Sequence, residues 1–125
     1  MFKKNNHNFS LIKNNKELDQ FLAKIKNKKK FFFDTEFERR STYQAIISIV
    51  VIFDGKNIGI IDCLEKNINF KKIFNFLNKK NITLVIHSCR QDLEIFLSVV
   101  KKILFTVFDT QIASLTAIIS RVSDG

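Results

Sequence analysis

The spacing of apolar and polar residues changes along the chain, from helical in some segments to extended in others. Between Leu18 and Ile25, apolar residues recur at helical spacing, which predicts a first helix. Asn14 or Asn15 stands where an N-cap residue is needed. The preceding segment, Asn8–Lys13, contains alternating apolar residues and is a candidate edge strand. The chain is therefore expected to begin with a short strand and a helix.

Three strands are predicted to follow this helix. Phe31–Phe37 is a mainly aromatic run typical of a buried strand, and Gln44–Phe53 is a long β-branched run. Asp54-Gly55 is a strong hairpin signal, and it leads into Asn57–Asp62 as the third strand. Because the connections between these strands are short, we expect an antiparallel meander.

The second half of the chain alternates between helical and extended patterns. The expected elements are a helix over Asn69–Lys79, a strand over Thr83–Ile86, a helix from Ser88 through Val100, a strand over Phe105–Asp109 and a helix over Thr110–Ile119. Strands that alternate with helices usually join a sheet in parallel. The pattern predicts one α/β domain over residues 1–125 with a mixed sheet of about five strands.

The charge of the chain permits a polyanionic partner but does not establish one. The net charge is +9 and the sequence pI is near 9.7, which favours partners such as nucleic acid. Lysine, asparagine, isoleucine and phenylalanine are plentiful while proline and tryptophan are absent, a composition that A/T-rich codons would produce. The positive charge therefore reflects either binding or genome composition.

Other features of composition favour a cytoplasmic, globular protein without a membrane partner. The apolar fraction is 46% and the mean hydropathy is near zero. Cys63 and Cys89 are isolated, which is typical of a reducing compartment. Met1–Asn15 lacks the apolar core of a signal peptide, and the longest apolar run, Ala45–Phe53, is far shorter than a membrane span.

Two carboxylates lie in the aromatic strand. Asp34 and Glu36 are two positions apart, so their side chains emerge on the same face of the strand. Buried charges are costly unless they are paired or hold a metal, which suggests a divalent cation between them. In the alternative reading, both acids lie at a frayed strand end, face water and pair with Arg39 or Arg40.

A third candidate carboxylate is Asp92. Ser88 and Gln91 have the spacing of a capping box, which would start a helix at Ser88. Asp92 then lies one turn inside, on the same face as Ile95 and Phe96. The helix macrodipole explains an acid near the N-terminus but not an acid on the apolar face. We therefore favour a functional Asp92.

His87 and Asp109 have less specific roles in the sequence. His87 stands at the end of a buried strand, where it either orients Asp92, contacts a ligand or serves as a structural histidine. Asp109 is most simply the N-cap of the last helix.

Three carboxylates at one end of a sheet would be suited to metal-dependent chemistry. We expect Asp34, Glu36 and Asp92 to converge at the open end of the sheet, where ligands of α/β folds tend to bind. Oxygen ligands suit Mg²⁺ or Mn²⁺. Two such ions about 3.5–4 Å apart activate a water and stabilise the leaving oxygen of a phosphodiester. The constellation predicts phosphodiester hydrolysis.

The ordered motifs resemble the catalytic domain of ribonuclease D, in the DEDD family of 3′–5′ exonucleases with a ribonuclease-H-like fold. The residues that carry the resemblance are Asp34-Thr35-Glu36-Phe37, Tyr43, Phe53-Asp54-Gly55 through Ile61-Asp62, His87-Ser88-Cys89-Arg90-Gln91-Asp92-Leu93-Glu94-Ile95-Phe96 and Asp109-Thr110-Gln111. The match spans roughly residues 10 to 115.

The resemblance implies a sheet ordered 3-2-1-4-5, two divalent metals, and removal of nucleotides from RNA 3′ ends, with transfer-RNA precursors as typical substrates. By position, it implies that Asp34, Glu36 and Asp92 are catalytic metal ligands. It also implies that the pocket for the terminal nucleotide is lined by Thr35, Phe37 and His87.

One part of the family pattern is missing from this sequence. The third motif, Tyr-x-x-x-Asp, supplies a tyrosine and a fourth carboxylate, but the only tyrosine here is Tyr43 and the only acid after Asp109 is Asp124. We therefore expect a C-terminally truncated exonuclease domain. The alternative is a catalytically inactive, nucleic-acid-binding remnant; a DNA proofreading exonuclease fits the motifs less closely. The sequence leaves the oligomeric state open.

Overall fold

The computed structural model of the chain describes residues 8–39, 45–87 and 89–112. Its elements, in chain order, are β1 (Asn8–Ile12), α1 (Asn15–Ile25), β2 (Lys30–Arg39), β3 (Ala45–Phe53), β4 (Asn57–Asp62), α2 (Lys71–Leu77), β5 (Thr83–Ile86), α3 (Arg90–Val99) and β6 (Thr106–Asp109). No helix within these ranges is both long enough and apolar enough to cross a membrane.

The strands form one mixed sheet in the order β1-β4-β3-β2-β5-β6. The pairs β2–β3 and β3–β4 are antiparallel, whereas β5 pairs in parallel with β2, and β6 with β5. The predicted order 3-2-1-4-5 is thus confirmed for β4-β3-β2-β5-β6. The prediction of five strands is corrected to six, because β1 pairs in parallel with β4 at the edge of the sheet.

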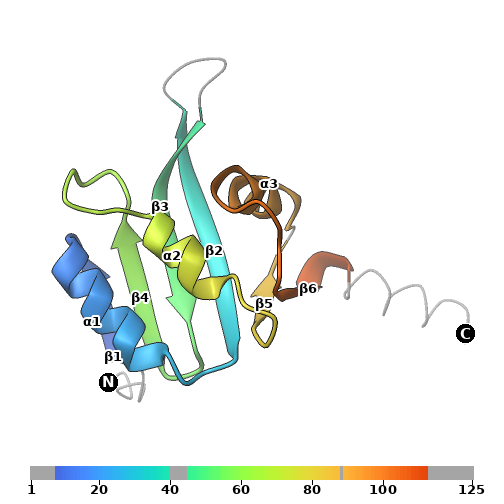
Figure 1. The fold of residues 1–125 in the computed structure, drawn as a ribbon. Coiled ribbons are helices and arrows are strands. Elements are labelled where there is room, and N and C mark those ends of the chain that lie inside the picture. The colour runs from blue at the N-terminus through green and yellow to red at the C-terminus, as the bar shows by residue number, and fades with distance from the viewer. Residues whose placement is uncertain (1–7, 40–44, 88, 113–125) are drawn as a thin grey trace, which may run out of the picture.

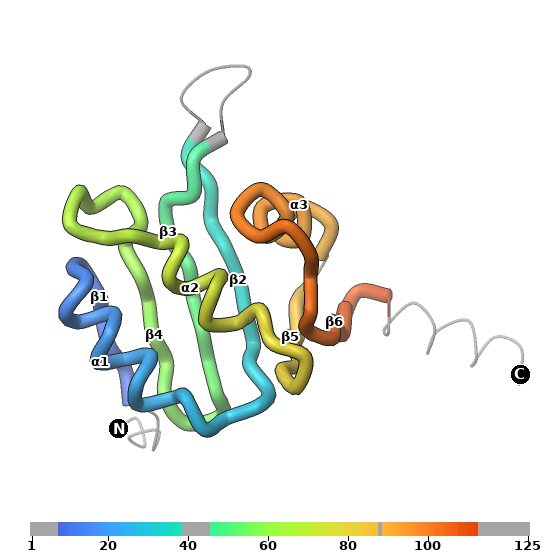
Figure 2. The backbone as a smooth tube through the Cα atoms, in the orientation of Figure 1, coloured from blue at the N-terminus to red at the C-terminus, as the bar shows by residue number. Residues whose placement is uncertain are grey.

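The three helices α1, α2 and α3 of the described ranges lie on the same face of this sheet (Figures 1 and 2). Phe33 of β2 contacts Phe74 of α2 and Phe96 of α3, with ring centroids 6.2 and 5.3 Å apart. Toward β4, on the same face of the sheet, Phe21 of α1 lies close to Gly59. A Cβ atom added at Gly59 would come within 2.5 Å of the Phe21 ring. We call this the helix face of the sheet and the opposite side the open face.

The hairpin between β3 and β4 forms where the sequence predicts it. Gly55 adopts a φ of +99°, which favours glycine. The Asp54 carboxylate accepts hydrogen bonds from the backbone amides of Lys56 and Asn57, at 2.8 and 2.6 Å. Burial alone would raise the pKa of Asp54. These hydrogen bonds and the charge of Lys28 lower the pKa by more than burial raises it, so the pKa of Asp54 lies below its ordinary value.

Several helix boundaries differ from those expected. Asn14 caps α1, with its side chain accepting from the Glu17 amide. In contrast, α3 begins at Arg90 with Cys89 at the N-cap position and no side-chain capping bond, so the predicted start at Ser88 is wrong. The buried residues of α3 face the sheet, and their packing determines the position of the helix whether or not a side chain caps its start. The predicted helix over Thr110–Ile119 lies largely outside the described residues.

Candidate functional site

Strand β2 presents different chemistry on its two faces. Phe31, Phe33 and Thr35 point to the helix face and are buried. Asp34 and Glu36 alternate with them and are exposed on the open face, as strand geometry requires. The two carboxylates that the sequence places together thus share one face of a central strand.

Asp92 approaches the same strand from the helix face. It lies in the first turn of α3, is only 6% exposed, and accepts a hydrogen bond at Oδ1 from the Thr35 hydroxyl. Burial raises the pKa of Asp92; the bond from Thr35 lowers it, while the negative charges of Asp34 and Glu36 raise it. The net pKa is above the ordinary value, because desolvation and like charges outweigh one hydrogen bond.

The three predicted metal ligands therefore lie on two sides of β2: Asp34 and Glu36 are on the open face, and Asp92 is on the helix face. Within residues 8–39, 45–87 and 89–112, no three His, Cys, Asp or Glu side chains are close enough to hold one metal ion. Asp92 is nevertheless near both other acids, because it accepts a hydrogen bond from Thr35, the residue between Asp34 and Glu36, and the charges of both raise its pKa. Their assignment as catalytic metal ligands stays a prediction.

The donor chemistry at the open face fits a hard divalent cation. In the part of the chain that is described, neither the Asp34 nor the Glu36 carboxylate accepts a hydrogen bond or joins an ion pair, and the Ser48 hydroxyl donates to the backbone carbonyl of Glu36 at 3.0 Å. Exposed, unpaired carboxylate oxygens are the ligands that Mg²⁺ and Mn²⁺ prefer. Pairing with Arg39 or Arg40 involves side chains outside the described set.

A hollow of about 380 Å³ adjoins Asp34 on the open face. Its lining residues come from β2, β3, β5 and the segments that follow β5 and β6: Phe32, Phe33, Asp34, Val51, Phe53, Val85, His87 and Thr110. His87 is exposed, and its Nδ1 lies 2.9 Å from Thr110 Oγ1. The His87 ring is thus oriented by Thr110, a partner that sequence reasoning did not identify.

The other residues predicted to line the nucleotide pocket lie on the helix face. Thr35 is buried against Asp92. Phe37 is half-buried and lines a separate hollow of about 350 Å³ together with Cys63 and Ile95. The structure therefore places His87 with Asp34 on one side of the sheet, and Thr35 and Phe37 on the other. Their substrate-binding roles stay predictions.

Asp109 fixes the start of α3 as well as its own turn. Its Oδ2 accepts from the Cys89 amide at 2.8 Å, and its Oδ1 accepts from the Gln111 amide at 2.9 Å. The first contact joins the end of β6 to the N-cap of α3, across twenty residues of sequence. Sequence reasoning found only the local turn, although parallel pairing of β5 and β6 brings their carboxyl ends together.

Comparison with known proteins identifies the class to which this arrangement belongs. The family model described as 3′–5′ exonuclease matches residues 9–123, nearly the whole chain. The chain belongs to this 3′–5′ exonuclease family.

Within that family, the chain is similar to ribonuclease D. It is 30% identical over 105 residues to ribonuclease D of Nitrobacter hamburgensis, covering 84% of this chain and 28% of that protein. It is 37% identical over 83 residues to ribonuclease D of Zymomonas mobilis, covering 66% of this chain and 21% of that protein. The chain thus spans about a quarter of the length of the curated relatives.

Solved structures agree with this placement. The structure matches RNase D of Escherichia coli, described as an exoribonuclease involved in structured RNA processing, with a TM-score of 0.72 and 28% identity over 86% of this chain and 28% of that one. RNase D of Trypanosoma brucei in complex with RNA U12 matches with a TM-score of 0.67 at 16% identity, over 84% and 38% of the two chains, and shows the shared fold. The ribonuclease-H-like fold expected from the motifs is confirmed.

Proposed function

We propose that the chain is the catalytic part of a ribonuclease D-type 3′–5′ exoribonuclease that removes nucleotides from RNA 3′ ends with the help of Mg²⁺ or Mn²⁺. The observation that carries this proposal is the pair of exposed carboxylates, Asp34 and Glu36, on a central strand of a 3′–5′ exonuclease fold. Transfer-RNA precursors are the substrate class and the cytoplasm is the location.

Each carboxylate has a role that its position supports. Asp34 and Glu36 would hold the cation, which would supply activation of a water and stabilisation of the leaving oxygen of the terminal phosphodiester. Asp92, which accepts a hydrogen bond from Thr35, would add negative charge from the helix side and support the metal, directly or through water. His87 lies in the hollow beside Asp34, where a terminal nucleotide would be in contact with it.

The test is a nuclease assay on the purified chain. A 5′-labelled single-stranded RNA incubated with Mn²⁺ should shorten one nucleotide at a time, and a chelator should stop the shortening. Asp34→Asn should reduce the rate at least 100-fold, because a metal ligand is lost. Asp19→Asn is the matched control, since Asp19 is an exposed acid on α1 paired with Lys72.

A second candidate function is RNA binding without turnover. The observation that favours it is the position of Asp92, which bonds Thr35 on the helix face and forms no metal-sized group with the other acids among the described residues. In the same assay, RNA that is bound but not shortened, with equal binding by wild type and Asp34→Asn, supports this second function and contradicts the first.

A further inference from the structure

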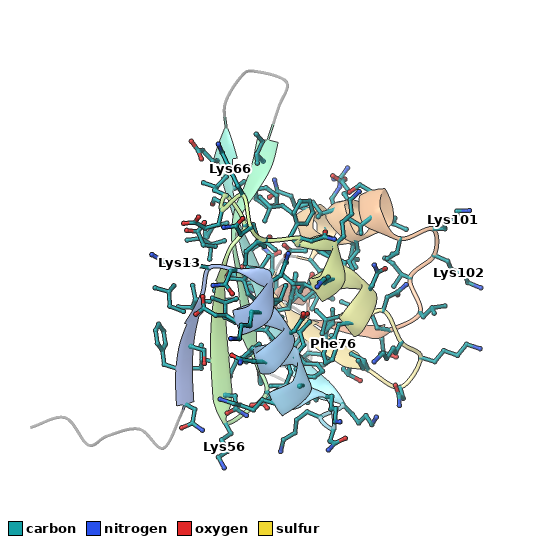
Figure 3. All side chains as sticks on the ribbon, turned by 60° about the vertical axis from the view of Figure 1, so that its left-hand side comes forward. Lys13, Lys56, Lys66, Phe76, Lys101 and Lys102 are labelled. Atoms are coloured by element: carbon teal, nitrogen blue, oxygen red, sulfur yellow. The ribbon has the colours of Figure 1, made fainter. Side chains whose placement is uncertain are left out.

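Lysines gather at one end of the sheet, where β2 begins and the chain turns from β3 into β4. Lys28 and Lys29 lie in the connection between α1 and β2, and Lys30 is the first residue of β2. Lys56 lies in the hairpin between β3 and β4. All four side chains are exposed. We call these four residues the basic end of the sheet; Lys56 marks it at the bottom of Figure 3.

The two loops that carry these lysines lie at the same end of the sheet (Figure 2). Phe32 of β2 pairs with Phe53 of β3 in antiparallel register, so the start of β2 lies beside the hairpin that follows β3. The fold therefore brings together lysines that are far apart in the sequence.

The one acid in these two loops, Asp54, is already bound within the hairpin. Its carboxylate accepts hydrogen bonds from the backbone amides of Lys56 and Asn57, and a third from the Asn57 side chain at 3.0 Å. In the described part of the chain, none of the four lysines forms an ion pair. The basic end therefore has an unbalanced positive charge.

The helix macrodipole does not account for these lysines. Lys24 lies in the last turn of α1 and Lys26 is its C-cap residue, where a cation complements the carbonyl groups. This effect falls off within the last turn. Lys28 and Lys29 follow the C-cap, and Lys30 already belongs to β2. Because like charges placed together repel one another, the cluster is suited to an anionic ligand and not to stabilising the fold.

Whatever meets the basic end must carry negative charge. Burying an ammonium group without a partner is costly, so an apolar segment would not cover four of them. Residues 26–30 and 54–57 contain no large apolar side chain, so these loops lack the anchor with which membrane-surface segments insert. Lysine is a point charge that binds phosphate without reading bases. A phosphate backbone fits this surface.

We propose that the basic end binds the phosphate backbone of RNA, independently of base sequence, and holds the substrate away from the predicted metal ligands. The choice of RNA as the polyanion rests on the proposed function. Asp34 lies four residues beyond Lys30, about 13 Å along β2, so the two contacts are separate. Binding at the basic end therefore needs neither the metal nor Asp34.

The test compares two variants of equal net charge. The basic-end variant replaces its four lysines with glutamine. The control variant makes the same change at four exposed lysines elsewhere: Lys13, Lys66, Lys101 and Lys102. Figure 3 shows these four well away from Lys56. Each variant loses four positive charges, so both have a net charge of +5 in place of +9.

Fluorescein-labelled oligouridylate is titrated with a chelator present, so that no turnover occurs, and anisotropy reports binding. At 50 mM NaCl the basic-end variant should bind at least about 30-fold more weakly than wild type, because four phosphate contacts are lost. The control variant should stay within about 3-fold of wild type, because salt screens charges that contact no phosphate. Oligoadenylate should bind wild type as oligouridylate does.

Protection of the lysines locates the RNA without any variant. The wild-type chain is treated with acetic anhydride with and without oligouridylate, and mass spectrometry reads acetylation at each lysine. RNA should slow acetylation of the four lysines of the basic end and leave that of Lys101 and Lys102 unchanged.

Three results would overturn the inference: no RNA binding by the wild type at 50 mM NaCl, equal loss of affinity in both variants, or protection of other lysines in place of the basic end. Phosphatidylserine vesicles that bind wild type but not the basic-end variant, while RNA binds both equally, would identify a membrane surface instead. RNA that binds through the basic end but is never shortened with Mn²⁺ contradicts only the proposed function. RNA that is shortened by wild type and bound as tightly by the basic-end variant contradicts only this inference.

Discussion

At the scale of single residues, the contact between Thr35 and Asp92 determines how the acidic groups of the chain are arranged. Thr35 lies between Asp34 and Glu36 in sequence but points to the opposite face. It donates to the buried Asp92 and so ties the start of α3 to β2. The sequence identified all four residues as important. It could not show this contact, because alternation along a strand gives the face of a side chain but not what packs against it.

The raised pKa of Asp92 predicts how stability depends on pH. Because burial and the charges of Asp34 and Glu36 raise this pKa, the folded state binds the proton more tightly than the unfolded state. The contribution of Asp92 is therefore most favourable below pH about 4 and is lost as pH rises through its higher folded value.

Asp92→Asn should consequently be more stable than wild type at pH 7, and the difference should shrink toward pH 4. Urea unfolding at pH 4, 5, 6 and 7 measures this. Asp19→Asn, at an exposed acid on α1, should show no such trend. If Asp92→Asn were instead less stable than wild type at every pH, the folded state would stabilise the charged carboxylate. That result would contradict a raised pKa of Asp92.

Removing the Thr35 hydroxyl should destabilise the chain. Thr35→Val keeps the shape of the side chain but leaves a buried carboxylate oxygen without its donor, at a cost of about 1–3 kcal/mol in the free energy of unfolding. Thr35→Ser keeps the donor and loses one methyl group, at a cost of about 1 kcal/mol. Chemical denaturation at pH 7 compares the two. A larger loss in the serine variant would mean that packing, and not the hydrogen bond, fixes Asp92.

At the scale of elements, the sequence predicts those whose signal is local and misses those whose boundary depends on a distant contact. Asn14 caps its helix and Asp54-Gly55 forms its turn as the sequence predicts, because the Asn14 and Asp54 side chains bond backbone groups two or three residues away. The start of α3 differs, since the Cys89 amide is bonded by Asp109 from β6. Such a partner is visible only once β5 and β6 are known to be neighbours.

The hairpin should depend on Asp54 in a pH-dependent way. Asp54→Ala removes the acceptor for two backbone amides and should cost about 1–2 kcal/mol in the free energy of unfolding at pH 7. Because the folded pKa of Asp54 is lowered, its contribution is present above pH about 4 and disappears as pH falls through the folded value.

Denaturation of wild type and Asp54→Ala at pH 7 and pH 3 measures this change. Asp54→Asn keeps an acceptor oxygen and should recover most of the stability without the pH dependence. If the alanine variant were as stable as wild type at pH 7, the turn would be held by Gly55 alone.

At the scale of the whole molecule, the resemblance to the exonuclease family implied the sheet order, but nothing in the sequence showed which face the three described helices cover. The meander and the parallel additions follow from loop lengths and from alternating patterns, which are properties of the chain. Which face the helices cover is a property of the assembled sheet: among the described residues, α1, α2 and α3 all pack on the side of Phe33 (Figure 2). The apolar side chains aligned across the sheet from Phe9 to Phe108 come from six strands joined by five separate registers, and no single segment contains them.

The net charge predicts that salt acts in opposite directions on folding and on RNA binding. A chain of +9 repels itself, so raising NaCl from 20 to 300 mM should raise the melting temperature by a few degrees. RNA binding should weaken over the same range, because phosphate contacts release counterions; four lysine contacts would give a slope of roughly −3 in a plot of log affinity against log salt.

Lys30→Gln tests whether that slope originates at the N-terminal end of β2. It removes the ammonium that lies 5.9 Å from the Phe32 ring centroid, and it should make the slope shallower by about 0.7, because one phosphate would lose its cation. Lys101→Gln is the matched control, since Lys101 lies beyond α3, at the far side of the molecule from Lys56 (Figure 3). The control should leave the slope unchanged, because charge that contacts no phosphate releases no ion. Equal slopes for wild type and Lys30→Gln would mean that RNA lies elsewhere on the surface, whereas a shallower slope in Lys30→Gln alone locates the phosphate backbone at the start of β2.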